Sequence, residues 1–457
     1  MSDWMPVSTV GTQQTIAVSA TRESTVHLTT FGCQMNEYDS ELVRSILIRA
    51  GYRFTEQLEQ AGVVLLNTCA IRERAHQTVY RVLDQLRWRK RGGEQLLVGL
   101  LGCMTTNLRE RLLLERPEID LVAGPDSYRR LPQLLRRARS QGLRGSDLSL
   151  SEYETYEQVY PRRAAGVNAW IAVMRGCDNF CSFCVVPYTR GRERSRDPDG
   201  VVEEVSRLAA EGFRQVTLLG QNVNSYRYGA VDFAELLLRV AAVDGIGRIR
   251  FTSPHPKDFP LRLLEALASC PKLCKQVHLP LQAGSDAVLE RMKRTYTQSE
   301  YLALVERIRS LVPEVKLSTD ILVGFAGESE EDFQATLRVV EQVGFDSAFT
   351  FQYSERVGTY AARHLPDDVP AAVKGERLQR LIALQRGISQ RLNRAEIGRL
   401  EEILVEGPSK RSSAEWVGRT DGNKVVIFPH AGERPGDLIR CRIVQASSAA
   451  LQGEKIA

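Results

Sequence analysis

The sequence predicts an α/β protein that ends in a small all-β module. Three observations support this fold class. Apolar strands alternate with helical patterns in the first third, the alternation restarts at Ala169, and short strands with turn signals follow Arg394. Alternation of this kind is typical of a parallel sheet with crossover helices, so we expect two α/β regions before the β module.

The first α/β region contains three strand–helix pairs. They are 27–32 with 37–50, 62–68 with 72–89, and 95–102 with 108–115. The polar segment after them has no apolar period, which is typical of a linker. Residues 1–24 lack the basic and apolar parts of a secretion signal, and we expect a disordered leader there.

The second α/β region contains six candidate strands, which predict a complete or partial barrel. The strands are 169–175, 216–220, 249–254, 276–281, 316–323 and 348–353. In the β module, the turn Asp421-Gly422 precedes an apolar run, as in a β-hairpin. We therefore expect a leader at 1–24, domains at 25–141, 163–394 and 395–457, and a linker at 142–162.

Composition narrows the class of protein. No apolar stretch approaches the ~20 residues that cross a bilayer, so we expect no membrane association. Nine cysteines in a chain without an export signal favour metal binding or catalysis over disulfides, and indicate the cytoplasm. The net charge of +5 is too small to predict a nucleic-acid partner by itself.

Cys177, Cys181 and Cys184, here called the central trio, follow the first strand of the second region. Three thiolates can hold a four-iron cluster and leave one iron open to a small molecule. Structural zinc is the alternative, but zinc normally takes four ligands, and neither a fourth Cys nor a His lies nearby in the sequence.

Cys33, Cys69 and Cys103, here called the N-terminal trio, each follow a predicted strand of the first region. Parallel strands end at one edge of a sheet and lie ~4.8 Å apart, so the three thiols can converge on a second cluster. Each could instead be a small buried hydrophobe. We assign that packing role to the remaining cysteines, Cys270, Cys274 and Cys441.

Around these cysteines the sequence resembles known families. Cys-x3-Cys-x2-Cys with Phe183 before the last cysteine resembles the radical S-adenosylmethionine (SAM) superfamily. From about residue 25 the chain is similar to the methylthiotransferases, through motifs at 32–36, 67–74 and 219–225, and the segments 418–428 and 436–443 resemble a TRAM domain. The resemblance implies a flavodoxin/Rossmann-like N-terminal domain, a radical SAM partial (β/α)6 barrel and a TRAM (OB-like) barrel.

The resemblance also implies the cofactors and the catalytic residues. In that family two [4Fe–4S] clusters work with two equivalents of S-adenosylmethionine per turnover. The central trio would hold the cluster that generates a 5′-deoxyadenosyl radical, which abstracts hydrogen from the substrate. The N-terminal trio would hold the cluster that donates the methylated sulfur. All six cysteines are thus candidate catalytic residues and iron ligands.

Candidate cofactor contacts lie near the ends of the barrel strands, where such barrels bind ligands. Gly220, Gln221 and Asn222 close the second strand, although a tight turn with a capping Asn is an equal alternative. The segments 278–282 and 318–325 resemble the family's cofactor-binding strands. We expect contacts from Phe183, Gly220, Gln221, Asn222, His278, Gln282, Ser318, Asp320 and Gly324; His278 could instead be a core histidine.

Candidate RNA contacts come from two segments. Arg190, Arg194 and Arg196 follow the central trio at even spacing, so an extended chain would present them on one face to a phosphate or carboxylate. A solvated basic loop is the alternative, and the resemblance does not specify Arg192. In the β module we expect contacts from Lys410, Arg411, Arg419 and Lys424.

Methylthiotransferases act on three substrates, and the residues after Cys69 distinguish them. Ala-Ile-Arg-Glu-Arg-Ala at 70–75 matches the branch that acts on N6-isopentenyladenosine (i6A) 37 of transfer RNA and forms the 2-methylthio derivative (ms2i6A). Threonylcarbamoyladenosine (t6A) 37 and a ribosomal-protein aspartate are the alternatives, and a non-catalytic, metal-containing RNA-binding protein is a different class of answer.

The expected partners follow from the same resemblance. They are the anticodon stem-loop of a transfer RNA, a low-potential electron donor such as flavodoxin or ferredoxin, and sulfur-delivery or cluster-assembly proteins. We expect a monomer.

Overall fold

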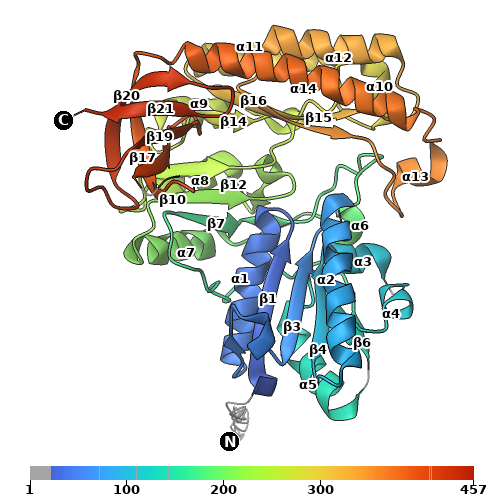
Figure 1. Cartoon of the computed structure of the whole chain (residues 1–457). Helices are drawn as coiled ribbons and strands as arrows, with labels where there is room; N and C mark the ends of the chain where they lie inside the picture. Colours follow the sequence, from blue (N-terminus) through green and yellow to red (C-terminus); the bar gives the residue numbers. More distant parts are fainter. Residues whose placement is uncertain are drawn as a thin grey trace, which may run out of the picture.

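The computed structural model describes residues 22–456, except 71–72, 110, 143, 411 and 413. In Figure 1 the N-terminal parallel sheet (blue to teal) lies below the central strands and helices, and the red β-barrel packs against their left end. Among the described residues, no helix has the length and apolar character needed to cross a membrane.

The N-terminal sheet has six parallel strands in the order β2-β1-β3-β4-β5-β6. Their bounds are β1 Thr25–Phe31, β2 Arg53–Phe54, β3 Val63–Thr68, β4 Leu97–Gly102, β5 Leu121–Ala123 and β6 Gly145–Asp147. The order β2-β1-β3-β4-β5 is that of flavodoxin-like folds. The parallel sheet that the sequence predicts is confirmed.

Helices cover both faces of this sheet. They are α1 Gln34–Arg49, α2 Glu73–Arg91, α3 Cys103–Leu108, α4 Arg111–Glu115 and α5 Leu131–Gln141. Val63 and Leu65 of β3 join one core with α1 and α5, while Val64 and Leu66 join another with α2. Burial on both faces explains why β3 begins with the unbroken apolar run Val63–Leu66.

Several elements at the edges of the sheet were not predicted. Strands β2, β5 and β6 are too short to give a periodic signal, and residues 145–147, which we expected in a linker, add β6 to the sheet. Of the predicted leader, residues 1–21 lie outside the described residues, and Arg22–Ser24 form a 3-10 turn.

The central region contains two three-stranded parallel sheets, β13-β10-β7 and β14-β15-β16. Their strands are β7 Asn168–Ala172, β10 Gln215–Leu219, β13 Arg248–Phe251, β14 Gln276–His278, β15 Lys316–Val323 and β16 Ser347–Gln352. All six predicted strands are present, although the first ends early: Met174–Arg175 forms β8, which pairs with β9 Arg194–Ser195. Residues 227–228 and 231–232 form the hairpin β11–β12.

Nine helices of the described residues belong to this region. They are α6 Val186–Arg190, α7 Pro198–Ala210, α8 Phe233–Ala241, α9 Leu261–Ser269, α10 Asp286–Arg291, α11 Gln298–Leu311, α12 Glu330–Val343, α13 Tyr360–His364 and α14 Ala371–Arg394. One buried apolar core runs between these helices and both sheets.

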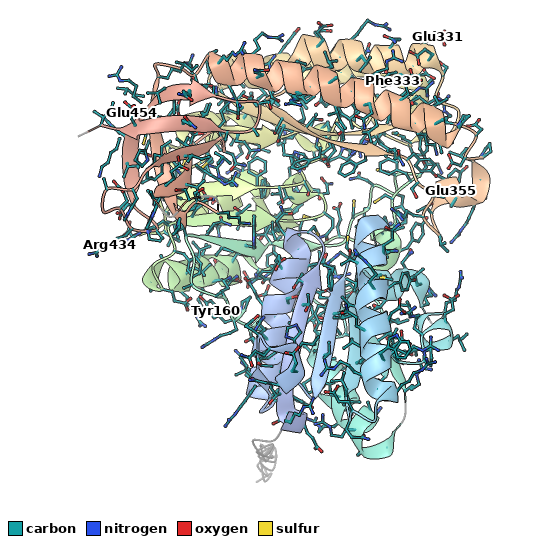
Figure 2. The ribbon with its side chains drawn as sticks, viewed as in Figure 1. Tyr160, Glu331, Phe333, Glu355, Arg434 and Glu454 are labelled. Carbon is teal, nitrogen blue, oxygen red and sulfur yellow. The ribbon has the colours of Figure 1, made fainter. Side chains whose placement is uncertain are left out.

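The N-terminal and central regions pack directly on each other. Ala172 of β7 and Leu219 of β10 share a buried cluster with Tyr38 of α1. Tyr160, labelled in Figure 2, links α1 to α7: its carbonyl accepts a hydrogen bond from Ser45 (2.7 Å), and Arg207 lies over its ring. The two regions therefore meet along an interface rather than through a tether.

The C-terminal module is a small β-barrel, as predicted, and its five strands close in the order β17-β18-β19-β21-β20. The bounds are β17 Leu400–Pro408, β18 Glu415–Arg419, β19 Val425–Pro429, β20 Leu438–Ala446 and β21 Leu451–Lys455. Buried Arg250 donates to the carbonyls of Thr420 (2.8 Å) and Asp421 (2.8 Å), which fixes the barrel to the edge strand β13.

Candidate iron–sulfur and cofactor site

The N-terminal trio lies at one edge of the sheet, as its strand-end positions predict. Cys33 caps α1 two residues after β1, Cys69 directly follows β3, and Cys103 begins α3 after β4. The three strands are neighbours, with Phe31 opposite Thr68 and Thr68 opposite Gly102. The sheet therefore brings together three cysteines that are far apart in sequence.

Two asparagines hold the loops that carry this trio. Asn36 donates to the Asn67 side chain (3.1 Å) and to the Thr68 carbonyl (3.2 Å), while Asn67 donates to the Asn36 carbonyl (2.9 Å). The Cys33 thiol donates to Asn36 Oδ1 at 3.3 Å. These contacts give a structural reason for both asparagines in the motifs at 32–36 and 67–74.

Gly102 is required directly before Cys103. Its φ is +90°, and a Cβ there would lie 2.5 Å from the Thr68 carbonyl oxygen. A side chain would thus be strained and would also clash with the loop that leads to Cys69.

The central trio lies in a single loop between β8 and α6. Ser182 ties this loop to the end of α10, since its amide donates to the Met292 carbonyl (3.0 Å) and its hydroxyl to the Arg291 carbonyl (2.7 Å). Each thiol receives a hydrogen-bond donor: Asn179 for Cys177 (3.5 Å), Arg294 for Cys181 (3.3 Å) and the Val186 amide for Cys184 (3.4 Å). Sequence reasoning missed Arg294, because it lies far from the trio along the chain.

The donor set fits iron–sulfur clusters. Cluster sulfurs accept hydrogen bonds, and here N–H groups point at Cys103 and at all three central thiols. Within the described part of the chain, no three His, Cys, Asp or Glu side chains are close enough to share one metal ion.

Burial keeps several of these thiols protonated in the metal-free chain. It raises the pKa of Cys103 to about 12, against the opposing charge of Arg190, and the pKa of Cys177 to about 11. Burial also raises the pKa of Cys184. Binding to iron must therefore displace these protons.

Gly220, Gln221 and Asn222 lie against the central loop. Gln221 Oε1 accepts a hydrogen bond from the Gly176 amide (2.6 Å), and a Cβ on Gly220 would lie 2.7 Å from the Met174 side chain. Asn222 donates to Asp258 at 2.9 Å, while its buried Oδ1 has no partner among the described residues. Among their side chains, Asn222 Oδ1 is thus an acceptor left free for a ligand.

His278, Ser318 and Asp320 form a polar group on neighbouring strands β14 and β15. His278 Nδ1 lies 3.0 Å from Ser318 Oγ, and its Nε2 lies 3.1 Å from Asp320 Oδ2. Phe349 of β16 is 57 % exposed and packs edge-on against His278. This half-open polar face with an aromatic neighbour could bind a nucleoside.

The other predicted cofactor contacts support the end of β15. Gln282 has a φ of +66°, and its backbone N–H donates a hydrogen bond to the Asp320 carbonyl (2.8 Å). Phe183 packs edge-on against Phe325, next to Gly324. Gly324 has φ of +71°, and a Cβ there would lie 2.3 Å from the Lys374 side chain. These residues connect the central loop to the strand that carries Asp320.

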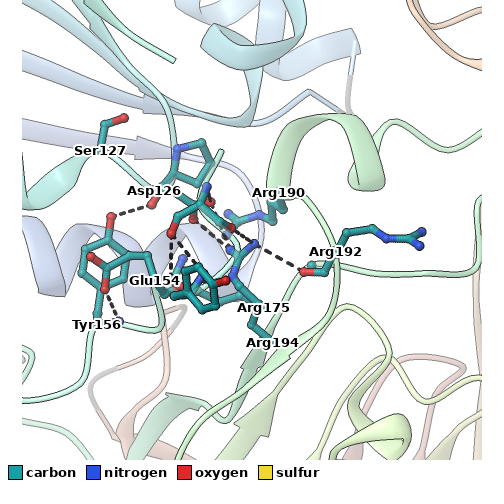
Figure 3. Close-up of polar contacts among 12 residues, drawn as sticks. Asp126, Ser127, Glu154, Tyr156, Arg175, Arg190, Arg192 and Arg194 are labelled. Carbon is teal, nitrogen blue, oxygen red and sulfur yellow. Dashed lines mark hydrogen bonds and ion pairs between the residues drawn. The ribbon is translucent and has the colours of Figure 1, made fainter. Parts of the chain in front are cut away.

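The prediction that Arg190, Arg194 and Arg196 face RNA is wrong. All three are buried, and they pair with Asp39 (2.8 Å), Asp126 (3.0 Å) and Glu204 (2.7 Å) respectively. The run is not extended throughout, because residues 186–190 form α6, whereas Arg194–Ser195 form the short strand β9. In Figure 3, Arg190 and Arg194 point into this charged cluster while Arg192, 65 % exposed, extends away from it.

Asp39 is the carboxylate at the centre of this interface. It is fully buried in α1 and accepts from both Arg175 Nη2 (2.7 Å) and Arg190 Nη2 (2.8 Å). Arg190 also donates from Nε to Cys103 Sγ at 3.1 Å. One guanidinium from the central region therefore reaches a cysteine of the N-terminal trio, a contact that no sequence motif indicated.

The predicted RNA contacts of the barrel differ in exposure. Lys410 is exposed, Arg411 lies outside the described residues, and Arg419 is half-buried beside Glu406 (2.9 Å). The prediction for Lys424 is wrong, since its buried ammonium pairs with Asp346 of the central region at 2.8 Å.

Family models match three segments of the chain. Residues 25–124 match "Uncharacterized protein family UPF0004", residues 171–340 the radical SAM superfamily, and residues 394–456 the TRAM domain.

Curated relatives cover nearly the whole chain. A tRNA-2-methylthio-N(6)-dimethylallyladenosine synthase of Porphyromonas gingivalis is 48 % identical over 95 % of this chain and 96 % of its own length. Proteins of the same name from Pelodictyon phaeoclathratiforme and Bacteroides thetaiotaomicron are 48 % and 46 % identical, over 95 % and 93 % of this chain and 99 % and 95 % of their own lengths.

Solved structures share the fold at low identity. The radical S-adenosylmethionine methyltransferase TsrM of Kitasatospora setae superposes with a TM-score of 0.54 at 16 % identity, covering 72 % of each chain. The cobalamin-dependent S-adenosylmethionine radical enzyme OxsB gives 0.51 at 12 % identity, covering 80 % of this chain and 56 % of its own. At such identities these likenesses describe the fold alone.

Proposed function

This chain belongs to the family of tRNA-2-methylthio-N(6)-dimethylallyladenosine synthases, and on that premise we propose how its two cysteine trios serve one reaction. It is a radical SAM methylthiotransferase that converts i6A37 of transfer RNA to ms2i6A37. Methylthiolation of t6A37 or of a ribosomal-protein aspartate is not favoured by the relatives' names.

The main support for this proposal is a hydrogen bond between Arg190, which follows the central trio, and Cys103 of the N-terminal trio. Arg190 ends α6, the helix that follows the central trio, and donates to Cys103 of the N-terminal trio at 3.1 Å. This contact brings Cys103 close to the helix that follows the central trio, as expected if both trios act on one substrate. Sulfur donation and hydrogen abstraction must both reach one adenine carbon, which requires a shared space.

Each trio has an assigned cluster. Cys177, Cys181 and Cys184 would hold the radical SAM cluster, and Cys33, Cys69 and Cys103 the auxiliary cluster. When bound, the first supplies the electron that cleaves S-adenosylmethionine, and the second supplies the sulfur. The hydrogen bonds from Asn179, Arg294 and Val186 orient the thiols of the central trio.

The polar strand ends would bind S-adenosylmethionine, of which two equivalents are used per turnover. Asp320 and Ser318 offer acceptors for hydroxyl groups, and His278 holds both in place through its two ring nitrogens. Asn222 offers its unpaired Oδ1 as an acceptor for an amino group. Phe183 supports the loop by packing on Phe325.

The anticodon stem-loop would contact cations beside the central trio and on the barrel. Arg192 lies over the Phe180 ring at 5.1 Å, beside the central trio, and Lys410 and Arg419 offer further charge on the barrel. Exposed arginines and aromatic rings suit single-stranded RNA. The protein would act in the cytoplasm as a monomer. A flavodoxin or ferredoxin would supply its electrons, and sulfur-delivery or cluster-assembly proteins would supply its sulfur.

Nucleoside mass spectrometry tests this function. Anaerobically reconstituted protein with dithionite, S-adenosylmethionine and transfer RNA carrying i6A37 should form ms2i6A. Transfer RNA carrying t6A37 and the ribosomal-protein substrate should stay unmodified under the same conditions. Product from either of them, with none from i6A37, would contradict the assignment; cofactor cleavage without any product would contradict methylthiotransfer.

A further inference from the structure

Arg190 makes more contacts than a structural ion pair requires. Its Nη2 donates to Asp39 at 2.8 Å and its Nε to Cys103 Sγ at 3.1 Å. Its Nη1 is buried and has no partner among the described residues. A buried donor without an acceptor is destabilising, so the free Nη1 indicates a ligand that would accept its hydrogen bond.

Two cysteines of the N-terminal trio lie near this guanidinium. Besides the hydrogen bond to Cys103, Arg190 interacts electrostatically with the Cys33 thiol. The function proposed above requires a hydrosulfide or methylthiolate anion to join the cluster of this trio. A guanidinium is the side chain best suited to bind an anion through several N–H groups at once.

We propose that Arg190 is a positioning residue for the donated sulfur: its Nε holds Cys103 and its free Nη1 binds the hydrosulfide or methylthiolate anion. This inference rests on the proposed function. The sulfur anion would then be bound by Arg190 of the central region as well as by the cluster that the three cysteines of the N-terminal sheet hold.

The surroundings fix Arg190 in place before any sulfur binds. Asp39 is fully buried and is held on its other oxygen by Arg175 at 2.7 Å. Arg175 in turn lies over the Tyr156 ring at 4.6 Å, and the Tyr156 hydroxyl donates to the Pro125 carbonyl at 2.7 Å. A guanidinium anchored in this way loses little conformational entropy when it binds an anion.

Sulfide titration followed by EPR spectroscopy tests the inference without measuring activity. Anaerobic full-length protein holding both clusters would be titrated with sodium sulfide, and the change in the auxiliary-cluster signal would give an apparent Kd. Arg190→Gln removes the charge, and Arg190→Lys keeps it but offers one nitrogen instead of three. Arg194→Gln is the matched control, because Arg194 is equally buried in the interface and its described hydrogen-bond partners are oxygens.

We expect sulfide to bind Arg190→Gln about tenfold or more weakly, and Arg190→Lys several-fold more weakly, with Arg194→Gln unchanged. Unchanged affinity in Arg190→Lys or Arg190→Gln would overturn the inference. So would an equal loss in Arg194→Gln, or loss of the cluster itself from both Arg190 variants, since Arg190 would then serve the fold. If the unmodified protein held a single cluster, the proposed function would fail instead.

Discussion

The two cysteine trios have the same number of ligands but are built in opposite ways. The central trio occupies eight consecutive residues of one loop, while the N-terminal trio comes from three neighbouring strands and spans residues 33–103. The central thiols receive donors from their own loop and from Arg294, whereas Cys103 receives Arg190 from the other region. The N-terminal site is therefore complete only when the two regions are packed together.

Because the two trios are separate sites, we expect that removing a cysteine from one trio abolishes its own reaction step and leaves the step of the other trio intact. Cys177→Ala should abolish cleavage of S-adenosylmethionine, because it removes a ligand of the cluster that supplies the electron. Cys103→Ala should leave cleavage near the unmodified level but stop formation of ms2i6A. Chromatography of 5′-deoxyadenosine and mass spectrometry of the nucleosides measure the two steps.

Cys441→Ala, in the barrel core, is the control and should retain both reactions. Equal loss of both reactions in Cys103→Ala, with the central cluster intact by spectroscopy, would contradict the division of labour.

The interface itself should be sensitive to the loss of Asp39. Asp39→Ala leaves Arg175 and Arg190 buried without their carboxylate, so we expect a loss of about 3–5 kcal/mol in the free energy of unfolding. Urea denaturation measures this. Glu203→Ala removes an exposed partner of Arg207 and should cost less than about 0.5 kcal/mol. Similar small losses in both variants would mean that Asp39 does not hold the regions together.

The stability of the central region should depend on pH through His255, a buried residue after β13 whose ring packs against Tyr296. Burial, and then the charges of Arg294 and Lys257, lower its pKa to about 2, so the folded protein keeps this ring neutral. In the unfolded chain the ring binds a proton below about pH 6.5. Stability should therefore fall as pH falls below that value, by up to about 1.4 kcal/mol per pH unit from this group.

His255→Gln should remove this part of the acid sensitivity. Denaturation at pH 7.5, 6.5 and 5.5 would compare the slopes of the two proteins. Parallel slopes would show that His255 is protonated in the folded state as well.

The exposed arginine beside the central trio should affect RNA binding alone. Arg192→Ala should weaken transfer-RNA binding several-fold and reduce the salt dependence by about one phosphate contact. Fluorescence anisotropy at several salt concentrations measures both. Arg207→Ala, exposed on α7, is the control. If Arg192→Ala bound transfer RNA with unchanged affinity, the RNA-binding surface would not include Arg192.

The sequence predicted most of the elements that have a periodic apolar pattern and the cysteine sites that follow recognisable strands. The strand–helix alternation predicted the parallel sheet, the six central strands and the barrel, and strand-end positions predicted that Cys33, Cys69 and Cys103 meet at one edge. Short strands such as Gly145–Asp147 gave no period. The spacing of Arg190, Arg194 and Arg196 indicated a surface, but their acidic partners, such as Asp39 and Asp126, lie far away in sequence, so burial could not be inferred.

Iron and sulfide analysis of anaerobically prepared protein, combined with Mössbauer spectroscopy, tests the central claim most directly. If each trio holds a [4Fe–4S] cluster, the unmodified chain should contain about eight irons. The triple variants Cys33→Ala/Cys69→Ala/Cys103→Ala and Cys177→Ala/Cys181→Ala/Cys184→Ala should each contain about four. Zinc in place of iron, or about four irons in the unmodified chain and in the N-terminal triple variant alike, would contradict the account.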